Sequence, residues 1–237
     1  MKIAIFTDSF FPGIGGTEKA VLGLAQELSK NNEVVVACPK MSQFDDSIFP
    51  FKVIRCNSVK LPGENYLSLP SLSKNLFNEI VEFSPDIIHC QSIYGFADAG
   101  IKFAKKLDIP VIMTLHTKFK QALKDVIKFN AVVNVFKKSW GNKLNECDKV
   151  CAVSADMNEE IKDYGYNGDF SVIKNGMMFN KIKNHEENKI LAQQTFNLTN
   201  SDNVLLFVGR IVKIKNLDCI LNSLSFLKNK DINYKML

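Results

Sequence analysis

The chain has 237 residues, of which 46% are hydrophobic and 23% are charged, and its formal net charge is +5 at pH 7. This composition is typical of a soluble globular protein and allows one large domain or two small ones. The charge is too small to indicate nucleic-acid binding, although it permits contact with anionic ligands or an anionic membrane surface.

The sequence predicts a cytoplasmic protein. No apolar run approaches the roughly 18 residues that a membrane-spanning helix needs. Asp8 interrupts the first apolar run too early for a secretory signal peptide. Cys147 and Cys151 lack a second Cys/His pair at zinc-site spacing, so we expect the six cysteines to be reduced core thiols and expect no metal site.

Strand-like and helix-like segments alternate along residues 1–180, which favours a parallel sheet covered by helices on both faces. The predicted strands are 2–7, 33–38, 51–56, 86–90, 110–116, 148–153 and 171–176. Helices are predicted after Thr17 as the N-cap and over 72–83, 96–107, 119–145 and 155–164, with a loop at 61–71. The expected fold of this region is one Rossmann-like α/β domain.

The pattern restarts after a polar linker at 181–202, in which a short helix is expected near 187–194. A strand at 204–210, a helix at 217–229 and the start of a strand at 232–237 follow. One βα unit and one further strand cannot bury both faces of a sheet. We therefore predict that 203–237 is the incomplete start of a second domain.

A glycine-rich turn, FFPGIGGTEKAV at Phe10–Val21, follows the first strand. It is not a dinucleotide fingerprint, because Glu18 stands at the third glycine position and the second strand ends at Cys38 without an acidic residue. It is not a Walker loop either, because no Gly-Lys-Ser/Thr follows. Gly15 and Gly16 then either hold a ligand against backbone N–H groups or form a tight turn with no ligand.

Four of the predicted strands end in polar residues: His89 and Gln91, His116 and Thr117, Ser154, and Asn175 with Gly176. Parallel strands end at one edge of a sheet, where ligands bind, so these residues are expected to line a cleft. One strand-end histidine is more often structural, but two beside a Gly-Gly turn indicate a site. Arg210 and Lys215 precede the last helix and either bind a diphosphate or form a solvated basic loop.

Six motifs, in the order in which they follow one another along the chain, together resemble those of the retaining, nucleotide-sugar-dependent glycosyltransferases of family 4, which have the two-domain GT-B fold. They are FFPGIGGTE, PDIIHCQS, PVIMTLHT, AVSADMNEEI, VIKNG and VGRIVKIKN, and they span essentially the whole chain. The resemblance implies an acceptor-side domain over 1–180 and the start of a nucleotide-sugar-binding domain over 203–237. It also implies sugar transfer, with retention, from a nucleotide-diphosphate sugar to a glycolipid or envelope polysaccharide, without a cofactor or a metal.

The resemblance assigns roles residue by residue. Gly15 and Gly16 match the glycine loop that approaches the donor, and His116 matches the catalytic strand-end histidine beside the transferred sugar. Arg210 and Lys215 match the pair that neutralises the departing diphosphate.

This chain also departs from the family pattern. The Glu-x7-Glu motif of the family would fall beyond the last residue, and VIKNGMM lacks the usual aspartate. We therefore expect these 237 residues to be inactive alone. The alternative function is a non-catalytic module that binds an acceptor or a membrane. A sugar-nucleotide epimerase would need a pair of acid/base carboxylates, and no convincing pair is present.

The segment 118–144 has helical periodicity and many lysines. Its expected apolar face is formed by Phe119, Leu123, Val126, Val133, Phe136 and Trp140, and Lys120, Lys124, Lys128, Lys138 and Lys143 lie largely off that face. One interpretation is an ordinary packed helix with a solvated lysine face. The other is a basic amphipathic surface that contacts anionic lipid and places the protein at the inner face of the membrane.

Overall fold

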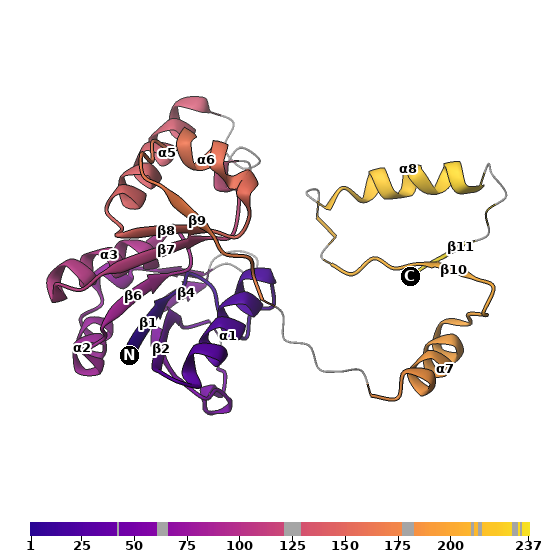
Figure 1. Cartoon of the computed structure of the whole chain (residues 1–237), viewed down its shortest axis with the longest axis horizontal. Coiled ribbons are helices and arrows are strands. Elements are labelled where there is room, and N and C mark those ends of the chain that lie inside the picture. The colour runs from indigo at the N-terminus through magenta and orange to yellow at the C-terminus, as the bar shows by residue number, and fades with distance from the viewer. Residues whose placement is uncertain are drawn as a thin grey trace. The chain divides into compact units, whose positions relative to one another are not determined.

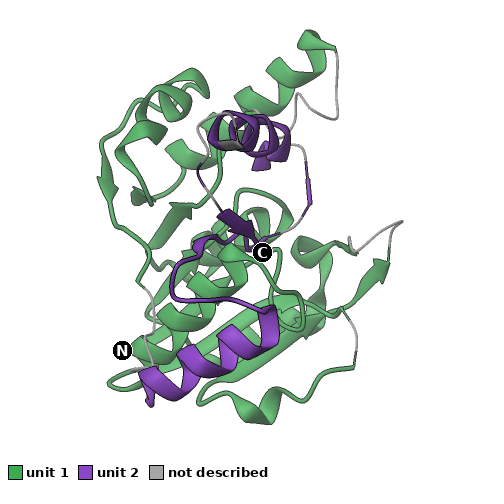
Figure 2. Ribbon diagram, turned by 90° about the vertical axis from the view of Figure 1, so that its right-hand side faces the viewer, with its two compact units in different colours: residues 1–178 green, residues 179–237 purple. Residues whose placement is uncertain are grey.

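The computed structural model of the chain describes residues 1–41, 43–60, 66–120, 129–176, 183–209, 211–212, 215–228, 232 and 234–237. The chain divides into two compact units, Met1–Met178 (unit 1) and Phe179–Leu237 (unit 2) (Figures 1 and 2). Each unit is described by itself.

Unit 1 is built on a seven-stranded sheet with the strand order β3-β2-β1-β6-β7-β8-β9, in which every neighbouring pair is parallel (Figure 1). The strands are β1 (Lys2–Phe6), β2 (Glu33–Pro39), β3 (Lys52–Cys56), β6 (Ile87–Cys90), β7 (Val111–Leu115), β8 (Lys149–Ala152) and β9 (Phe170–Val172). All seven predicted strands and the α/β class are confirmed. The last strand is shorter than predicted, because only Phe170–Val172 pairs with β8.

Helices cover the two faces of this sheet unequally. The helices α2 (Lys74–Phe83), α3 (Gly95–Leu107), α5 (Asn130–Asn145) and α6 (Asn158–Asp163) share a core with Ala4 and Phe6 of β1. The alternate residues Ile3 and Ile5 face the other way and pack against Val21 of α1 (Gly16–Ser29). Because side chains alternate along a strand, His89 of β6 lies on the α1 face, in register with Ile5.

A small antiparallel ribbon corrects the predicted loop at 61–71. The strand β4 (Ser58–Lys60) pairs with β5 (Tyr66–Ser68), and a 3-10 turn, η2 (Pro70–Leu72), follows. Residues 61–65 lie outside the described part of the chain. A three-residue strand is too short to show a period in the sequence, and its hydrogen bonds come from a partner that the local pattern does not contain.

Three predicted helices have different boundaries. Gly15, with an extended backbone, is the N-cap of α1, so the predicted cap Thr17 lies in the first turn. The predicted helix 119–145 is interrupted, because Phe129 is extended (φ −89°, ψ 109°) and α5 begins at Asn130. The predicted helix 155–164 is a 3-10 turn, η3 (Ala155–Met157), followed by the short α6. Apolar periodicity does not reveal these breaks, because it continues through them.

Unit 2 consists of α7 (His185–Phe196), β10 (Asn203–Leu205), α8 (Leu217–Lys228) and β11 (Tyr234–Met236). The two strands are parallel and pair over three residues each, and β10 is shorter than the predicted strand 204–210, of which residue 210 lies outside the described part of the chain. Among the residues described for this unit, none is buried, and Val208 is 83% exposed. These elements therefore do not enclose a core of their own.

Candidate functional site

The glycine turn after β1 holds one of the chain's own carboxylates. Glu18 Oε1 accepts a hydrogen bond from Ser9 Oγ, and a Cβ built on Gly15 would overlap Glu18 Oε2. A side chain at Gly15 would thus displace the Glu18 carboxylate, whereas a Cβ on Gly16 would meet nothing within 4 Å. Glu18 lies in the first turn of α1, where the exposed N–H groups of the helix favour a negative charge.

Hydrogen bonds from Arg55 of β3 link this turn to the sheet. Its guanidinium donates to the carbonyl oxygen of Phe11 (2.8 Å) and to that of Pro39 (3.2 Å). It also forms a bidentate ion pair with Asp46, in which Nε donates to Oδ2 (2.8 Å) and Nη2 donates to Oδ1 (2.6 Å). The Arg55 side chain is only 11% exposed. Sequence reasoning missed Arg55, although an arginine inside the apolar strand KVIRC indicates a buried ion pair.

A second carboxylate lies at the same edge of the sheet. Asp8 follows β1, and its carboxylate accepts hydrogen bonds from the N–H of Phe96 (3.1 Å) and from Ser92 Oγ. Phe96 belongs to the first turn of α3, so Asp8 binds the amino end of that helix. Burial raises the pKa of Asp8 in spite of these hydrogen bonds.

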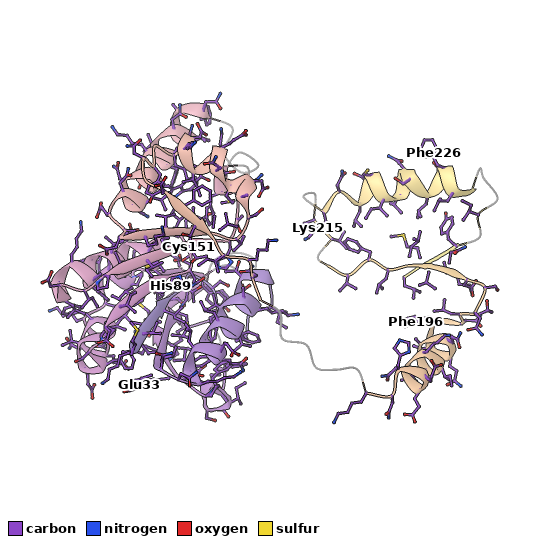
Figure 3. All side chains as sticks on the ribbon, viewed as in Figure 1. Glu33, His89, Cys151, Phe196, Lys215 and Phe226 are labelled. Carbon is purple, nitrogen blue, oxygen red and sulfur yellow. The ribbon has the colours of Figure 1, made fainter. Side chains whose placement is uncertain are left out.

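A cavity of about 340 Å³ lies on the α1 face of the sheet. One wall comes from α1 and the other from the segment after β9, and strands β6 and β7 with the residues after them form the floor. The lining residues are Ala20, Gly23, Leu24, Glu27, His89, Gln91, Thr114, His116, Ile173, Lys174, Asn175 and Gly176. Figure 3 labels His89, one of these lining residues, in unit 1.

The floor of the cavity is a continuous hydrogen-bonded row of side chains. Thr114 Oγ1 lies 2.8 Å from His89 Nε2, and the amide nitrogen of Gln91 lies 2.9 Å from the same atom. The amide oxygen of Gln91 lies 2.7 Å from His116 Nε2. The other ring nitrogen of His116, Nδ1, is buried without a hydrogen-bond partner among the described residues.

Both histidines of the floor are neutral at pH 7. Burial, and secondarily the neighbouring His116, lowers the pKa of His89 from 6.5 to about 4. Burial also lowers the pKa of His116. The floor therefore offers neutral hydrogen-bonding groups, which suit the hydroxyl groups of a sugar.

Acidification should destabilise unit 1 through His89. Below pH 6.5 the unfolded chain binds a proton at this imidazole, whereas the folded chain does so only near pH 4. The free energy of unfolding should therefore fall, by about 2 kcal/mol from His89 alone between pH 7 and pH 5. Urea unfolding followed by the fluorescence of Trp140, the single tryptophan, measures this dependence. His89→Gln should reduce the dependence of the free energy of unfolding on pH, whereas His185→Gln, at an exposed position, should not. The same pH dependence in the parent chain and both variants would contradict the prediction.

The structure brings together five of the predicted site residues: His89, Gln91, His116, Asn175 and Gly176 line the same cavity. Four other predicted residues do not line this cavity, namely Gly15, Gly16, Thr117 and Ser154. Thr117 and Ser154 are exposed. Lys215 belongs to the turn before α8 in unit 2 (Figure 3), and Arg210 lies outside the described residues. Thr114 was missed, although strand alternation places it on the same face as His116.

The predicted apolar face of 118–144 is divided between core and surface. Phe119, Val133 and Trp140 are buried, whereas Phe136 is exposed. Lys120 pairs with Asp163 and Lys143 pairs with Asp98, and Lys138 is exposed. Leu123, Lys124, Val126 and Lys128 lie outside the described residues. The described part of this segment thus packs one side of α5 on the core and leaves Phe136 and Lys138 exposed on the other, which fits either interpretation.

All six cysteines are free, and Cys38, Cys56, Cys90 and Cys151 are buried, as expected of core thiols. Cys147 is half-buried and Cys219 is exposed, so the prediction of a core position is wrong for Cys219. In the part of the chain that the structure describes, no three His, Cys, Asp or Glu side chains gather as ligands for a metal ion. No helix within the same residues is both long and apolar enough to cross a bilayer.

The parallel sheet, with a glycine turn after its first strand and polar side chains at its strand ends, is the α/β fold of GT-B glycosyltransferases. The crystal structure of HepE from Anabaena in complex with UDP-glucose superposes on this chain with a TM-score of 0.69. The two are 17% identical, and the match covers 94% of this chain and 57% of HepE. At this identity the likeness shows the fold.

The sequence model of Glycosyltransferase Family 4 matches residues 14–178. The chain belongs to this family.

Two relatives are similar in sequence to nearly the whole chain. A GDP-mannose-dependent alpha-mannosyltransferase of Corynebacterium glutamicum is 24% identical over 230 residues, which are 93% of this chain and 54% of that protein. An alpha-monoglucosyldiacylglycerol synthase of Streptococcus pneumoniae is 26% identical over 239 residues, 98% of this chain and 54% of that protein. The chain spans about half the length of these relatives.

Proposed function

We propose that this chain is part of a glycosyltransferase that moves a sugar, with retention, from a nucleotide-diphosphate sugar to a glycolipid or an envelope polysaccharide. The observation that carries the proposal is the cavity, because its floor of neutral hydrogen-bonding side chains suits a sugar. These side chains are His89, Gln91, Thr114 and His116, and the chain belongs to Glycosyltransferase Family 4. The names of the two relatives support a nucleotide-sugar donor and a glycolipid acceptor.

Each candidate residue has a part in this proposal. His116 contacts the transferred sugar, and the turn at Gly15 and Gly16 allows close approach of the donor. Arg210 and Lys215 neutralise the diphosphate as it leaves, because cations held beside a departing anion lower the barrier to its departure. The proposal needs neither a cofactor nor a metal ion.

Transfer of label from UDP-glucose or GDP-mannose to lipid vesicles containing diacylglycerol tests the activity. The product of the complete reading frame should transfer label, and His116→Ala should reduce the transfer to background while the exposed His185→Ala leaves it unchanged. The 237 residues alone should transfer negligibly, because the elements described for unit 2 enclose no core. Binding of acceptor lipid with no transfer by either protein would instead favour the non-catalytic module.

We further propose peripheral membrane contact, at the inner face of the membrane, through an exposed apolar set at the start of α5. The set is Phe129, Val132, Val135 and Phe136, of which Phe129 is 76% and Val135 is 70% exposed. Lys138 on the same helix is exposed as well. Apolar side chains beside a cation are suited to the boundary of an anionic bilayer.

Sedimentation with anionic vesicles at roughly 0.05 M and 0.5 M salt measures this contact. The chain should bind at low salt and bind several-fold less at high salt, since the lysine contribution is screened. Phe129→Ser with Val135→Ser should weaken binding at both salts, whereas Leu191→Ser, at an exposed position of α7, should not. Binding that is absent or insensitive to salt contradicts the proposal.

A further inference from the structure

We propose that Gln91 couples the tautomers of His89 and His116, and that it thereby presents His116 Nδ1 as a hydrogen-bond acceptor for a ligand hydroxyl. Gln91 is then a positioning residue that acts through His116. The inference deepens the proposed function and rests on it for the nature of the ligand, but the coupling itself is a property of the free chain.

The coupling follows from the chemistry of a primary amide. An amide donates from its nitrogen and accepts at its oxygen, so the two imidazoles that it joins must present opposite groups. With the Gln91 amide oriented as it is here, its Nε2 faces His89 Nε2 at 2.9 Å, so His89 Nε2 presents a lone pair and its hydrogen is on Nδ1. Gln91 Oε1 faces His116 Nε2 at 2.7 Å, so His116 carries its hydrogen on Nε2.

The neighbours of the row are compatible with this arrangement. The Thr114 hydroxyl, 2.8 Å from His89 Nε2, can share the same lone pair with Gln91 as the second donor of a three-centre hydrogen bond. The charged residues that line the cavity are Glu27, which pairs with Lys30, and Lys174. Rotating the Gln91 amide by half a turn would exchange both tautomers together, so one side chain determines the state of both rings.

This state decides what His116 can bind. With its hydrogen on Nε2, the ring presents a lone pair at Nδ1, the atom that is buried without a partner among the described residues. A buried acceptor without a donor is costly, so a ligand group that donates to Nδ1 gains affinity. A sugar hydroxyl donates a hydrogen bond, whereas an ionised phosphate oxygen only accepts. The geometry therefore favours a hydroxyl at His116 over a phosphate.

Nitrogen NMR of the imidazole rings tests the tautomers directly. The chain has three histidines, and His185, exposed on α7, supplies the reference spectrum. Long-range ¹H–¹⁵N correlations at pH 7 should show His89 protonated on Nδ1 and His116 on Nε2. The same protonated nitrogen in both rings, or His116 protonated on Nδ1, overturns the inference without the need for any variant.

Gln91→Glu tests the coupling. A carboxylate accepts at both oxygens, so His89 should change to the Nε2-protonated tautomer while His116 keeps its own, and the pKa of both rings should rise. Gln194→Glu, at an exposed position of α7, adds the same charge and should change neither ring. A folded Gln91→Glu protein in which His89 keeps its hydrogen on Nδ1 overturns the coupling.

Titration with nucleotides separates this inference from the proposed function. UDP-glucose or GDP-mannose should shift the ¹⁵N resonance of His116 Nδ1, and UDP or GDP without the sugar should not. An equal shift with the bare nucleotides overturns the assignment of a hydroxyl. If neither nucleotide sugar shifts the His116 resonance, His116 does not contact the sugar, and both the proposed function of this site and the hydroxyl assignment are wrong. The tautomer coupling is tested separately, by the spectrum of the free chain.

Discussion

Gly141→Ala is expected to destabilise unit 1 by about 3 kcal/mol, at the upper end of the usual cost of overpacking. A Cβ on Gly141 of α5 would overlap the carbonyl oxygen of Tyr164, directly after α6. That atom belongs to the backbone and cannot rotate away, so the two segments would have to separate. Trp140 and Leu144, on the same part of α5, are buried and would lose contacts.

Urea unfolding followed by Trp140 fluorescence measures the loss. Gly23→Ala is the matched control, because Gly23 is also inside a helix but a Cβ there would meet nothing within 4 Å. Alanine is the better helix former by about 1 kcal/mol, so this control should be more stable than the parent chain. The prediction is wrong if the two substitutions change the stability in the same direction.

Arg55→Met is expected to cost about 3 kcal/mol and to loosen the glycine turn. Methionine retains the apolar stem of the side chain but leaves the carboxylate of Asp46 and the carbonyl oxygens of Phe11 and Pro39 without their donor. Removing one partner of a partly buried ion pair costs more than the pair itself contributes, because the Asp46 carboxylate, whose side chain is only 27% exposed, then loses its compensating charge. Arg55→Lys should recover part of the loss, since an ammonium restores the charge but cannot reach all three acceptors.

The control for Arg55 is Lys30→Met. It breaks the exposed pair with Glu27 and should change the free energy of unfolding by less than about 1 kcal/mol. Amide hydrogen exchange at residues 10–16 provides a second measurement, because the turn should open more often in Arg55→Met. If the turn exchanges as slowly in Arg55→Met as in the parent chain, Arg55 does not hold it.

The strands and half of the candidate site were predictable because both follow from local rules. Buried parallel strands appear as short apolar runs, and their polar ends share one edge, which led to His89, Gln91 and His116. The hydrogen bonds that join these side chains were not predictable. They depend on the register of β6 against β7, which the spacing of residues within each strand does not contain.

Most of the remaining errors come from interactions that are distant in the sequence. Arg55 acts on Phe11, 44 residues away, so no window around either residue reveals the contact. The strand at Tyr66–Ser68 exists because Ser58–Lys60 pairs with it. The break at Phe129 interrupts an apolar period that continues on both sides of it. The Arg55 contact and the ribbon are each decided by a partner elsewhere in the chain, which overrides local propensity, whereas no contact of the described residues explains the break at Phe129.

The two carboxylates at the carboxyl edge of the sheet determine where charge can be placed on a donor. The strand order reverses at β1, and at such a switch point the helix amino ends usually attract a phosphate. Here Glu18 lies at the start of α1 and Asp8 binds the start of α3, so a carboxyl group of the chain already lies at the amino end of each helix. This edge should therefore repel a diphosphate and accept the uncharged end of a donor. Under the proposed function, an activated sugar would then be oriented at this edge by charge before any of its hydroxyls is recognised.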